Sequence, residues 1–182
     1  MTNSDFKIKI QEKLPLHKIE KGLFLFIYRA TRIPPHLGII FNGKLYDITL
    51  QGANNGEDAA EFLNTIIKKY TKTVFFEIKL PQFNTAAYLI EILSNSVKKY
   101  NKVSETTSCI LPIKLFFQEA YKINTSQANF IFDLLPILFQ HQFILNTYHL
   151  NLERHIIDNQ FVLKTYTKED ILNCLQALNL LI

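Results

Sequence analysis

The chain has 182 residues, of which 48% are hydrophobic and 20% are charged, enough for one folded domain with a real core and unlike a disordered chain. The net charge of +4 is mildly basic, and no basic run is interleaved with aromatic residues, so we expect no nucleic-acid partner. No apolar run reaches the ~18 residues of a membrane span, and the N-terminus lacks a signal-peptide core. These features predict a soluble, cytoplasmic protein without a membrane span.

The first part of the sequence predicts mostly strands. Residues 5–20 are mixed in charge and predict a short lead-in. Residues 22–28 form an apolar run that begins at a glycine, which is typical of a strand buried on both faces. The pair Asn42-Gly43 is the strongest short signal for a β-hairpin, because both central residues of a type I′ turn need positive φ. It predicts a hairpin over residues 34–49.

The rest of the sequence predicts mostly helices. Loops are predicted over 51–57 and 101–108, a strand over 74–80 and a possible hairpin over 146–165. Helices are predicted over 58–70, 109–121 and 167–181. One further helix begins after a cap at Asn84 or Thr85, and another begins at Gln127 and should end or kink at Pro136. Strands gather early and helices late, which favours an α+β fold with an antiparallel sheet packed against helices. No glycine-rich loop joins a strand to a helix, so we expect no nucleotide cofactor, and no other cofactor is predicted.

The predicted hairpin places a histidine, a carboxylate and a hydroxyl on one face. The register of an Asn42-Gly43 turn sets His36 opposite Thr49. Nearer the turn, Gly38 lies opposite Asp47. Because side chains alternate along a strand, His36, Asp47 and Thr49 share a face. A base with an orienting partner is half of a nucleophilic site, and both Asp47 and Thr49 are candidates for that partner.

Cys109 is the candidate for the other half. It follows the Ser/Thr-rich loop 101–108 and opens a predicted helix with Pro112 in its first turn. A helix N-terminus stabilises a thiolate, and its free N–H groups can bind the oxyanion of a tetrahedral intermediate. His36 would take the thiol proton and later protonate the leaving group, while Asp47 would orient the imidazole. This mechanism requires the helix N-terminus to pack against the His36 face of the sheet.

The two cysteines also allow simpler interpretations. Cys109 and Cys174 are too few for a disulfide framework and have no metal-binding spacing, although a single bridge between them stays open. A lone cysteine is more often a small core residue than a nucleophile. Cys174 lies among leucines of a predicted helix, which predicts a core position. The Phe-rich segment 127–143 is interpreted as core in preference to a partner surface.

Four segments carry a family resemblance. They are 18–26 (KIEKGLFLF), 35–40 (PHLGII), 42–47 (NGKLYD), and Ser108-Cys109 opening the helix that ends in Glu119-Ala120-Tyr121. In this order they resemble the circularly permuted papain-like cysteine peptidases of the NlpC type, in which the histidine precedes the cysteine. The resemblance implies a permuted papain-like core over 18–121, within a single domain spanning 1–182. Residues 122–182 would then form a helical C-terminal extension.

The same resemblance implies a thiol hydrolase or acyltransferase. Cys109 would be the nucleophile, His36 the base and Asp47 the orienting residue. The substrate would carry an amide or ester bond, in a peptide, a cell-wall peptide or a lipid. The chain departs from the family at Leu23, where relatives carry an aspartate, and at Ile110-Leu111, where relatives often carry a polar pair. These departures support a second hypothesis, a catalytically inactive binding or scaffold protein on the same fold.

Overall fold

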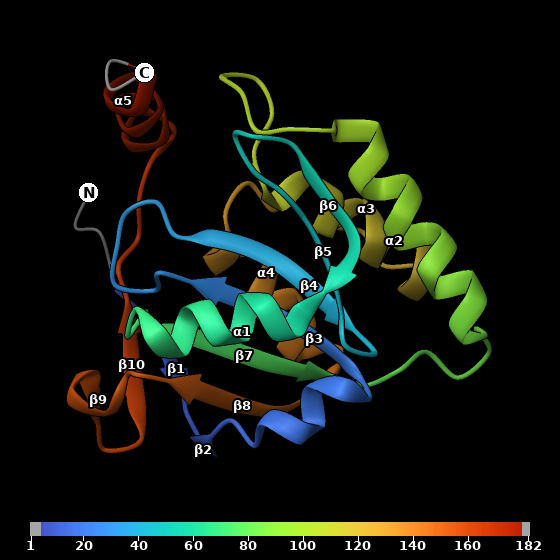
Figure 1. Cartoon of the computed structure of the whole chain (residues 1–182), viewed down its shortest axis with the longest axis horizontal. Helices are drawn as coiled ribbons and strands as arrows, with labels where there is room; N and C mark the ends of the chain where they lie inside the picture. Colours follow the sequence, from blue (N-terminus) through green and yellow to red (C-terminus); the bar gives the residue numbers. More distant parts are fainter. Residues whose placement is uncertain (1–4, 180–182) are drawn as a thin grey trace.

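The fold is built on one seven-stranded sheet (Figure 1). The structure is a computed structural model that describes residues 5–179. From one edge of the sheet to the other, the strands are β2 (Glu12–Lys13), β8 (Ile144–Leu150), β7 (Thr73–Ile78), β3 (Leu23–Tyr28), β4 (His36–Phe41), β5 (Lys44–Ile48) and β6 (Ala53–Asp58). Every neighbouring pair is antiparallel except β2 with β8. A smaller antiparallel sheet has the order β1 (Phe6–Lys9), β10 (Gln160–Leu163) and β9 (Ile156–Ile157).

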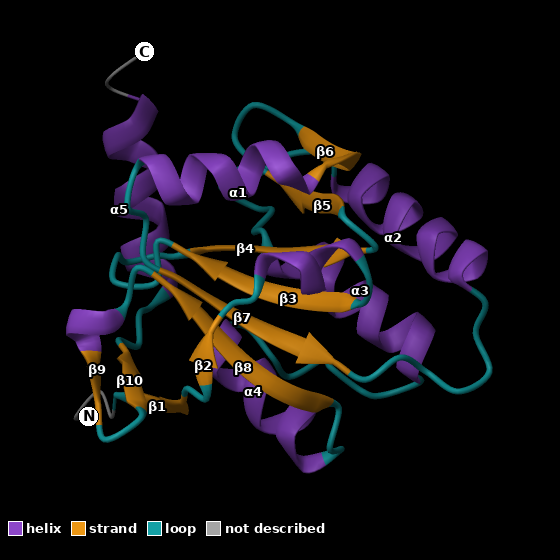
Figure 2. Ribbon diagram, turned by 60° about the horizontal axis from the view of Figure 1, so that its bottom comes forward, coloured by secondary structure: helices purple, strands orange, loops and turns teal. Residues whose placement is uncertain are grey.

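Helices cover both faces of the large sheet (Figure 2). The helices are α1 (Ala59–Lys68), α2 (Ala86–Tyr100), α3 (Ile110–Tyr121), α4 (Ile131–Gln140) and α5 (Lys168–Asn179), with short 3-10 turns at Leu16–Glu20 and Glu153–His155. The buried residues of α1 pack on one face of the sheet, and those of α2, α3 and α4 form a larger core on the other. The predicted α+β class is therefore confirmed. Within residues 5–179, no helix is both long and apolar enough to cross a membrane.

The central hairpin has the predicted register next to its turn, and its ladder ends at the pair of Ile39 with Tyr46, short of the predicted pairs Gly38–Asp47 and His36–Thr49. Phe41 pairs with Lys44 and Ile40 with Leu45, around a turn whose residues Asn42 and Gly43 have φ of 48° and 73°. The alternation is also as expected, because Ile40 and Leu45 contribute to the core beneath α1. The neighbouring β3 is buried on both faces, which explains its unbroken apolar sequence.

The predicted starts of α1, α2 and α5 agree closely with the structure. The Asp58 carboxylate accepts the N–H of Ala60 and caps α1, and the Thr85 hydroxyl accepts the N–H of Tyr88 and caps α2. Before α5, Thr167 and Asp170 bond each other reciprocally in the arrangement of a capping box. The predicted end of this helix at residue 181 lies outside the described residues.

Three predictions about strands were wrong. Residues 51–57 contain most of β6, an edge strand of polar residues without the apolar alternation that reveals a half-buried strand. The lead-in 5–20 contains β1 and β2. Residues 122–182 are not a helical extension, because β8 lies inside the large sheet between β2 and β7, and β9 and β10 form a hairpin in the smaller sheet.

The helix α4 differs from its prediction at both ends. It begins at Ile131, after the Asp133 carboxylate has accepted the N–H groups of Asn129 and Phe130, and it continues past Pro136 to Gln140. A proline inside a helix costs about 3 kcal/mol, but the aliphatic residues on either side are fully buried and offset that loss. These residues are Ile131, Leu134, Leu135 and Leu138. The interpretation of this segment as core is confirmed for them.

Candidate active site

The hairpin brings His36 and Asp47 into direct contact. The Nε2 atom of His36 lies 2.7 Å from Oδ2 of Asp47, whose side chain is only 3% exposed. Asp47 is therefore shielded from water and holds the imidazole at the start of β4. The predicted pairing of a base with an orienting carboxylate is present in the structure.

Gly38 provides the space for this contact. A Cβ atom at position 38 would lie 2.7 Å from the Cβ of Asp47 and 2.7 Å from Cε1 of Phe26, closer than real Cβ atoms approach. The backbone of Gly38 has no positive φ, so the glycine is required by packing rather than by conformation. Without a side chain at position 38, the Asp47 carboxylate can reach diagonally across the hairpin to His36.

Asn54 is a site residue that sequence reasoning missed. It pairs with Asp47 across β5 and β6, and its Nδ2 donates to Oδ1 of Asp47 at 2.6 Å. Both carboxylate oxygens of Asp47 are thus engaged. The register of β6 shifts within this pairing, and Gly56, with φ of 92°, is the residue without an opposite partner. A polar stretch with two glycines gave no strand signal, so the sequence did not place Asn54 beside Asp47.

Thr49 has a structural role. Its hydroxyl donates to the carbonyl of Gly52 at 3.0 Å and accepts the N–H of Gln51 at 3.2 Å, which closes the turn between β5 and β6. Of the two candidates for the partner of His36, the structure selects Asp47.

Cys109 lies at the N-cap of α3 and lines the same cavity as His36. Burial would lower the pKa of His36, but hydrogen bonds to Asp47 and to Cys109, together with the negative charges of both partners, raise the pKa to about 10. His36 is therefore protonated at neutral pH and places a positive charge beside the cavity that Cys109 lines. The structure brings together all three predicted site residues.

The predicted approach of α3 was wrong, although Cys109 and His36 do line one cavity. α3 buries Ile110 and Ile113 in the larger core, together with Leu37 and Ile39, on the face opposite His36. The helix is apolar along most of its length and packs where it buries most surface. Cys109 and His36 share the cavity at the N-terminal end of β4. They do not face each other across the sheet.

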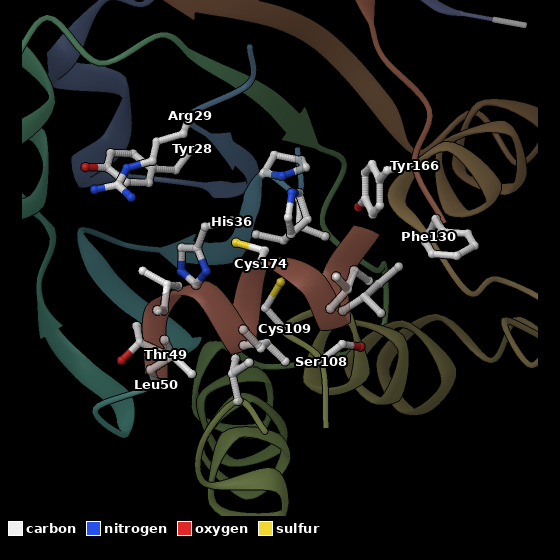
Figure 3. A pocket seen from close by; sticks show the side chains of 18 of the residues that line it. Tyr28, Arg29, His36, Thr49, Leu50, Ser108, Cys109, Phe130, Tyr166 and Cys174 are labelled. Atoms are coloured by element: carbon white, nitrogen blue, oxygen red, sulfur yellow. The ribbon is translucent and has the colours of Figure 1, made fainter. Parts of the chain in front are cut away.

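A cavity of about 460 Å³ surrounds Cys109 and His36 (Figure 3). Its walls come from the start of β4, the turn after β5, the start of α3, Phe130, Tyr166 and one face of α5. The walls are largely apolar. The α5 face consists of Ile171, Cys174, Leu175 and Leu178.

Two lining residues were not expected at the site. Cys174, predicted to lie in the core, is half-buried and points into the cavity (Figure 3). Tyr166 is 6% exposed; burial raises its pKa, and the nearby negative charge of Cys109 raises it further. The Tyr166 hydroxyl therefore keeps its proton and is a hydrogen-bond donor beside Cys109. Tyr166 follows β10 in a connecting segment, where the sequence carries no chemical signal for this role.

A metal centre finds no support in the described part of the chain. No cluster of three or more His, Cys, Asp or Glu side chains in residues 5–179 is arranged to hold an ion. Besides the pair of His36 and Asp47, the cavity is lined by the guanidinium of Arg29.

Comparisons with known proteins identify no relative. A scan against family models finds no match to the sequence, and neither do searches of curated proteins and of solved structures.

Proposed function

We propose that this chain is a thiol-dependent hydrolase or acyltransferase that acts on an amide or ester bond. The observation that carries the proposal is the cavity that Cys109 and His36 line together, with the His36 ring held 2.7 Å from the buried Asp47 carboxylate. A nucleophile beside a base, with the base oriented by a third group, is the arrangement that acyl transfer needs. The cavity beside Cys109 leaves room for a substrate.

In the proposed mechanism the Cys109 thiolate attacks the carbonyl carbon of the substrate. The N–H of Ile110, the first residue of α3, has no acceptor within the helix, and Tyr166 lines the same cavity as Cys109. These two donors are suited to stabilise the oxyanion. The His36 imidazolium then protonates the leaving amine or alcohol, which leaves an acyl group on Cys109.

The second half of the reaction releases that acyl group. Neutral His36 takes a proton from water, or from a second alcohol or amine, as it attacks the thioester. Asp47 orients the imidazole and stabilises the imidazolium whenever it forms, while Asn54 donates to the second carboxylate oxygen. The apolar cavity walls favour an apolar acyl group on the substrate.

The order and placement of the three site residues support the proposal that the chain has a permuted papain-like fold of the NlpC type. Base and carboxylate lie on a hairpin that precedes the cysteine, and the cysteine caps a helix. The departure at Leu23 does not remove a site group. Leu23 pairs with Phe41, at the end of β3 opposite the pairing of Tyr28 with His36, and it is 1% exposed in the core.

Thiol reactivity tests the proposal without knowledge of the substrate. At pH 6, iodoacetamide should modify Cys109 about 100-fold faster than Cys174, because only Cys109 faces a protonated histidine. Peptide mapping by mass spectrometry separates the two rates within one sample, and a Cys109→Ser variant isolates the rate of Cys174. Equal, slow labelling of both cysteines would favour the inactive binding or scaffold protein.

Turnover is the second part of the test. A panel of p-nitrophenyl esters and anilides with acyl groups of increasing length should include a substrate whose hydrolysis falls about 10³-fold or more in Cys109→Ser. A hydrolysis rate unchanged by that substitution would place the reaction outside this cavity.

A further inference from the structure

The two cysteines of the chain line one cavity. The sequence contains no others, and they lie 65 positions apart on α3 and α5. In Figure 3 both sulfur atoms point into the cavity, on the side where His36 lies. Both cysteines are half-buried and free. The fold thus sets the proposed nucleophile and a second thiol against the same space.

The two thiols differ in their surroundings. Cys109 lines the cavity beside His36, whose Nε2 lies 2.7 Å from the Asp47 carboxylate and whose pKa is raised to about 10, so that the imidazole is protonated at neutral pH. Cys174 shares its helix face with Ile171, Leu175 and Leu178, so its neighbours on α5 are apolar. A thiolate stabilised by a cation reacts with peroxides, whereas a neutral thiol in apolar surroundings does not. Cys109 is therefore the thiol that oxidises first.

The two helices also differ in how firmly they are held. Of the α5 side chains that the structure describes, Leu175 alone is buried. The helix follows a short connection over 164–167 and lies at the margin of the molecule (Figure 1). A disulfide needs the two Cα atoms within about 7 Å, and a lightly held helix can adjust to that distance.

We propose that Cys109 and Cys174 form a reversible disulfide when the protein meets a hydroperoxide, and that this bond closes α5 over the site. The proposal rests on the proposed function, because it needs the reactive Cys109 thiolate. The bond would remove the nucleophile and fix the α5 face across the cavity at the same time. Reduction by a dithiol would restore both.

With hydrogen peroxide as the oxidant, the chemistry takes two steps. The Cys109 thiolate attacks one oxygen of the peroxide and the O–O bond breaks, which gives a sulfenic acid and a hydroxide that leaves as water with a proton from the imidazolium or the solvent. The Cys174 thiol then loses its proton as its sulfur attacks the Cys109 sulfur. The S–S bond forms, the S–O bond breaks, and the hydroxide leaves as a second water. Two thiols are oxidised by two electrons, and one peroxide is reduced to two waters.

The experiment treats the reduced, full-length protein with a small excess of hydrogen peroxide. The reaction is quenched with N-ethylmaleimide in denaturant and mapped by mass spectrometry. We expect a peptide pair linked through Cys109 and Cys174, a mass lower by two hydrogens, and loss of labelling at both cysteines. Dithiothreitol should restore full labelling. The wild-type map needs no variant, so a variant that fails to fold does not affect it.

Two variants serve as controls. In Cys174→Ser the Cys109 sulfenic acid has no thiol to react with, so it should proceed to sulfinic acid, which dithiothreitol does not reverse. In the double variant Cys174→Ser/Gln176→Cys, the same helix carries a thiol at an exposed position that does not line the cavity. This thiol should not protect Cys109 from over-oxidation.

The outcomes separate this inference from the proposed function. Rapid alkylation of Cys109 by iodoacetamide, with sulfinic acid forming equally fast in wild type and Cys174→Ser, would overturn the disulfide and leave the proposed function standing. Disulfides found only between two copies of the chain would also overturn it. A Cys109 that reacts with neither iodoacetamide nor peroxide would overturn both.

Discussion

The helices α3 and α5 line the same cavity with one cysteine each, yet the fold holds them very differently. α3 buries six of its residues, namely Ile110, Pro112, Ile113, Phe116, Phe117 and Ala120. Among the described side chains of α5, only Leu175 is buried. The Cys109 thiol, which needs a fixed position relative to His36, lies at the start of the firmly packed α3. The lightly packed α5 can move without unfolding the domain.

The largest expected difference between the two walls is in stability. Phe116→Ala on α3 should lower the free energy of unfolding by about 3–5 kcal/mol, because Phe116 is fully buried and leaves a cavity. Leu175→Ala on α5 should lower the free energy of unfolding by about 1 kcal/mol or less, because it affects the packing of one lightly held helix only. Urea unfolding followed by circular dichroism measures both values. Similar losses would show that α5 is held as firmly as α3.

The second effect concerns the two thiols. His36→Ala should slow alkylation of Cys109 at pH 6 by about 100-fold, because the thiolate loses its cationic partner. The rate of Cys174 should stay unchanged, so the two cysteines would become alike. His149→Ala is the matched control, since His149 is a buried histidine on β8 that does not line the cavity. A rate at Cys109 that survives His36→Ala would exclude the proposed ion pair.

The raised pKa of His36 also gives stability a pH dependence. The ordinary histidine pKa is about 6.5, and in the folded protein it is about 10. The stabilisation from protonated His36 is therefore fully present below the unfolded value and is lost as the pH rises through the folded value. The free energy of unfolding should fall as the pH rises from 6.5 to 10. The same measurement on His36→Ala should not show this fall.

The third effect tests the space beneath the site. Gly38→Ala should destabilise the protein by about 1–3 kcal/mol, because the new methyl group meets Phe26 and the Cβ of Asp47. It should also slow Cys109 alkylation by pushing Asp47 away from His36. Adding Phe26→Leu relieves one of the two clashes, so the double variant should lose less stability than the sum of the single variants. Strict additivity would mean that Phe26 does not limit the space.

The smallest effect is expected at the orienting carboxylate. Asp47→Asn keeps the shape of the side chain but removes its charge, so the pKa of His36 should fall and Cys109 alkylation at pH 6 should slow by about tenfold. Asn54→Ala leaves the charge in place and should have a smaller effect on the same rate. A larger effect at Asn54 than at Asp47 would reverse their proposed roles.

The sequence predicted the parts of the site that are local in the chain. The Asn42-Gly43 turn fixes the hairpin register, and the register fixes which residues share a face with His36. The caps of α1, α2 and α5 were also predictable, because a side-chain oxygen bonds an N–H two or three residues away.

The parts that join distant segments were not predictable. Asn54 belongs to a polar edge strand without apolar alternation, and Tyr166 and Cys174 reach the cavity only through the packing of the C-terminal segments. The approach of α3 was predicted on the wrong face, because helix amphipathicity tells which side of a helix is buried but not which face of a sheet receives it. Such placements depend on the whole fold.

The position of β8 inside the sheet, between β2 and β7, has a consequence for how the chain folds. Residues 144–150 cover the edge of β7, and β2, near the N-terminus, pairs in parallel with β8. A fragment ending at residue 121 would leave Val74, Phe75 and Phe76 on an open sheet edge, which invites aggregation. During synthesis the sheet cannot close until more than four-fifths of the 182 residues have been made. This long sequence separation predicts slow, late folding for the emerging chain.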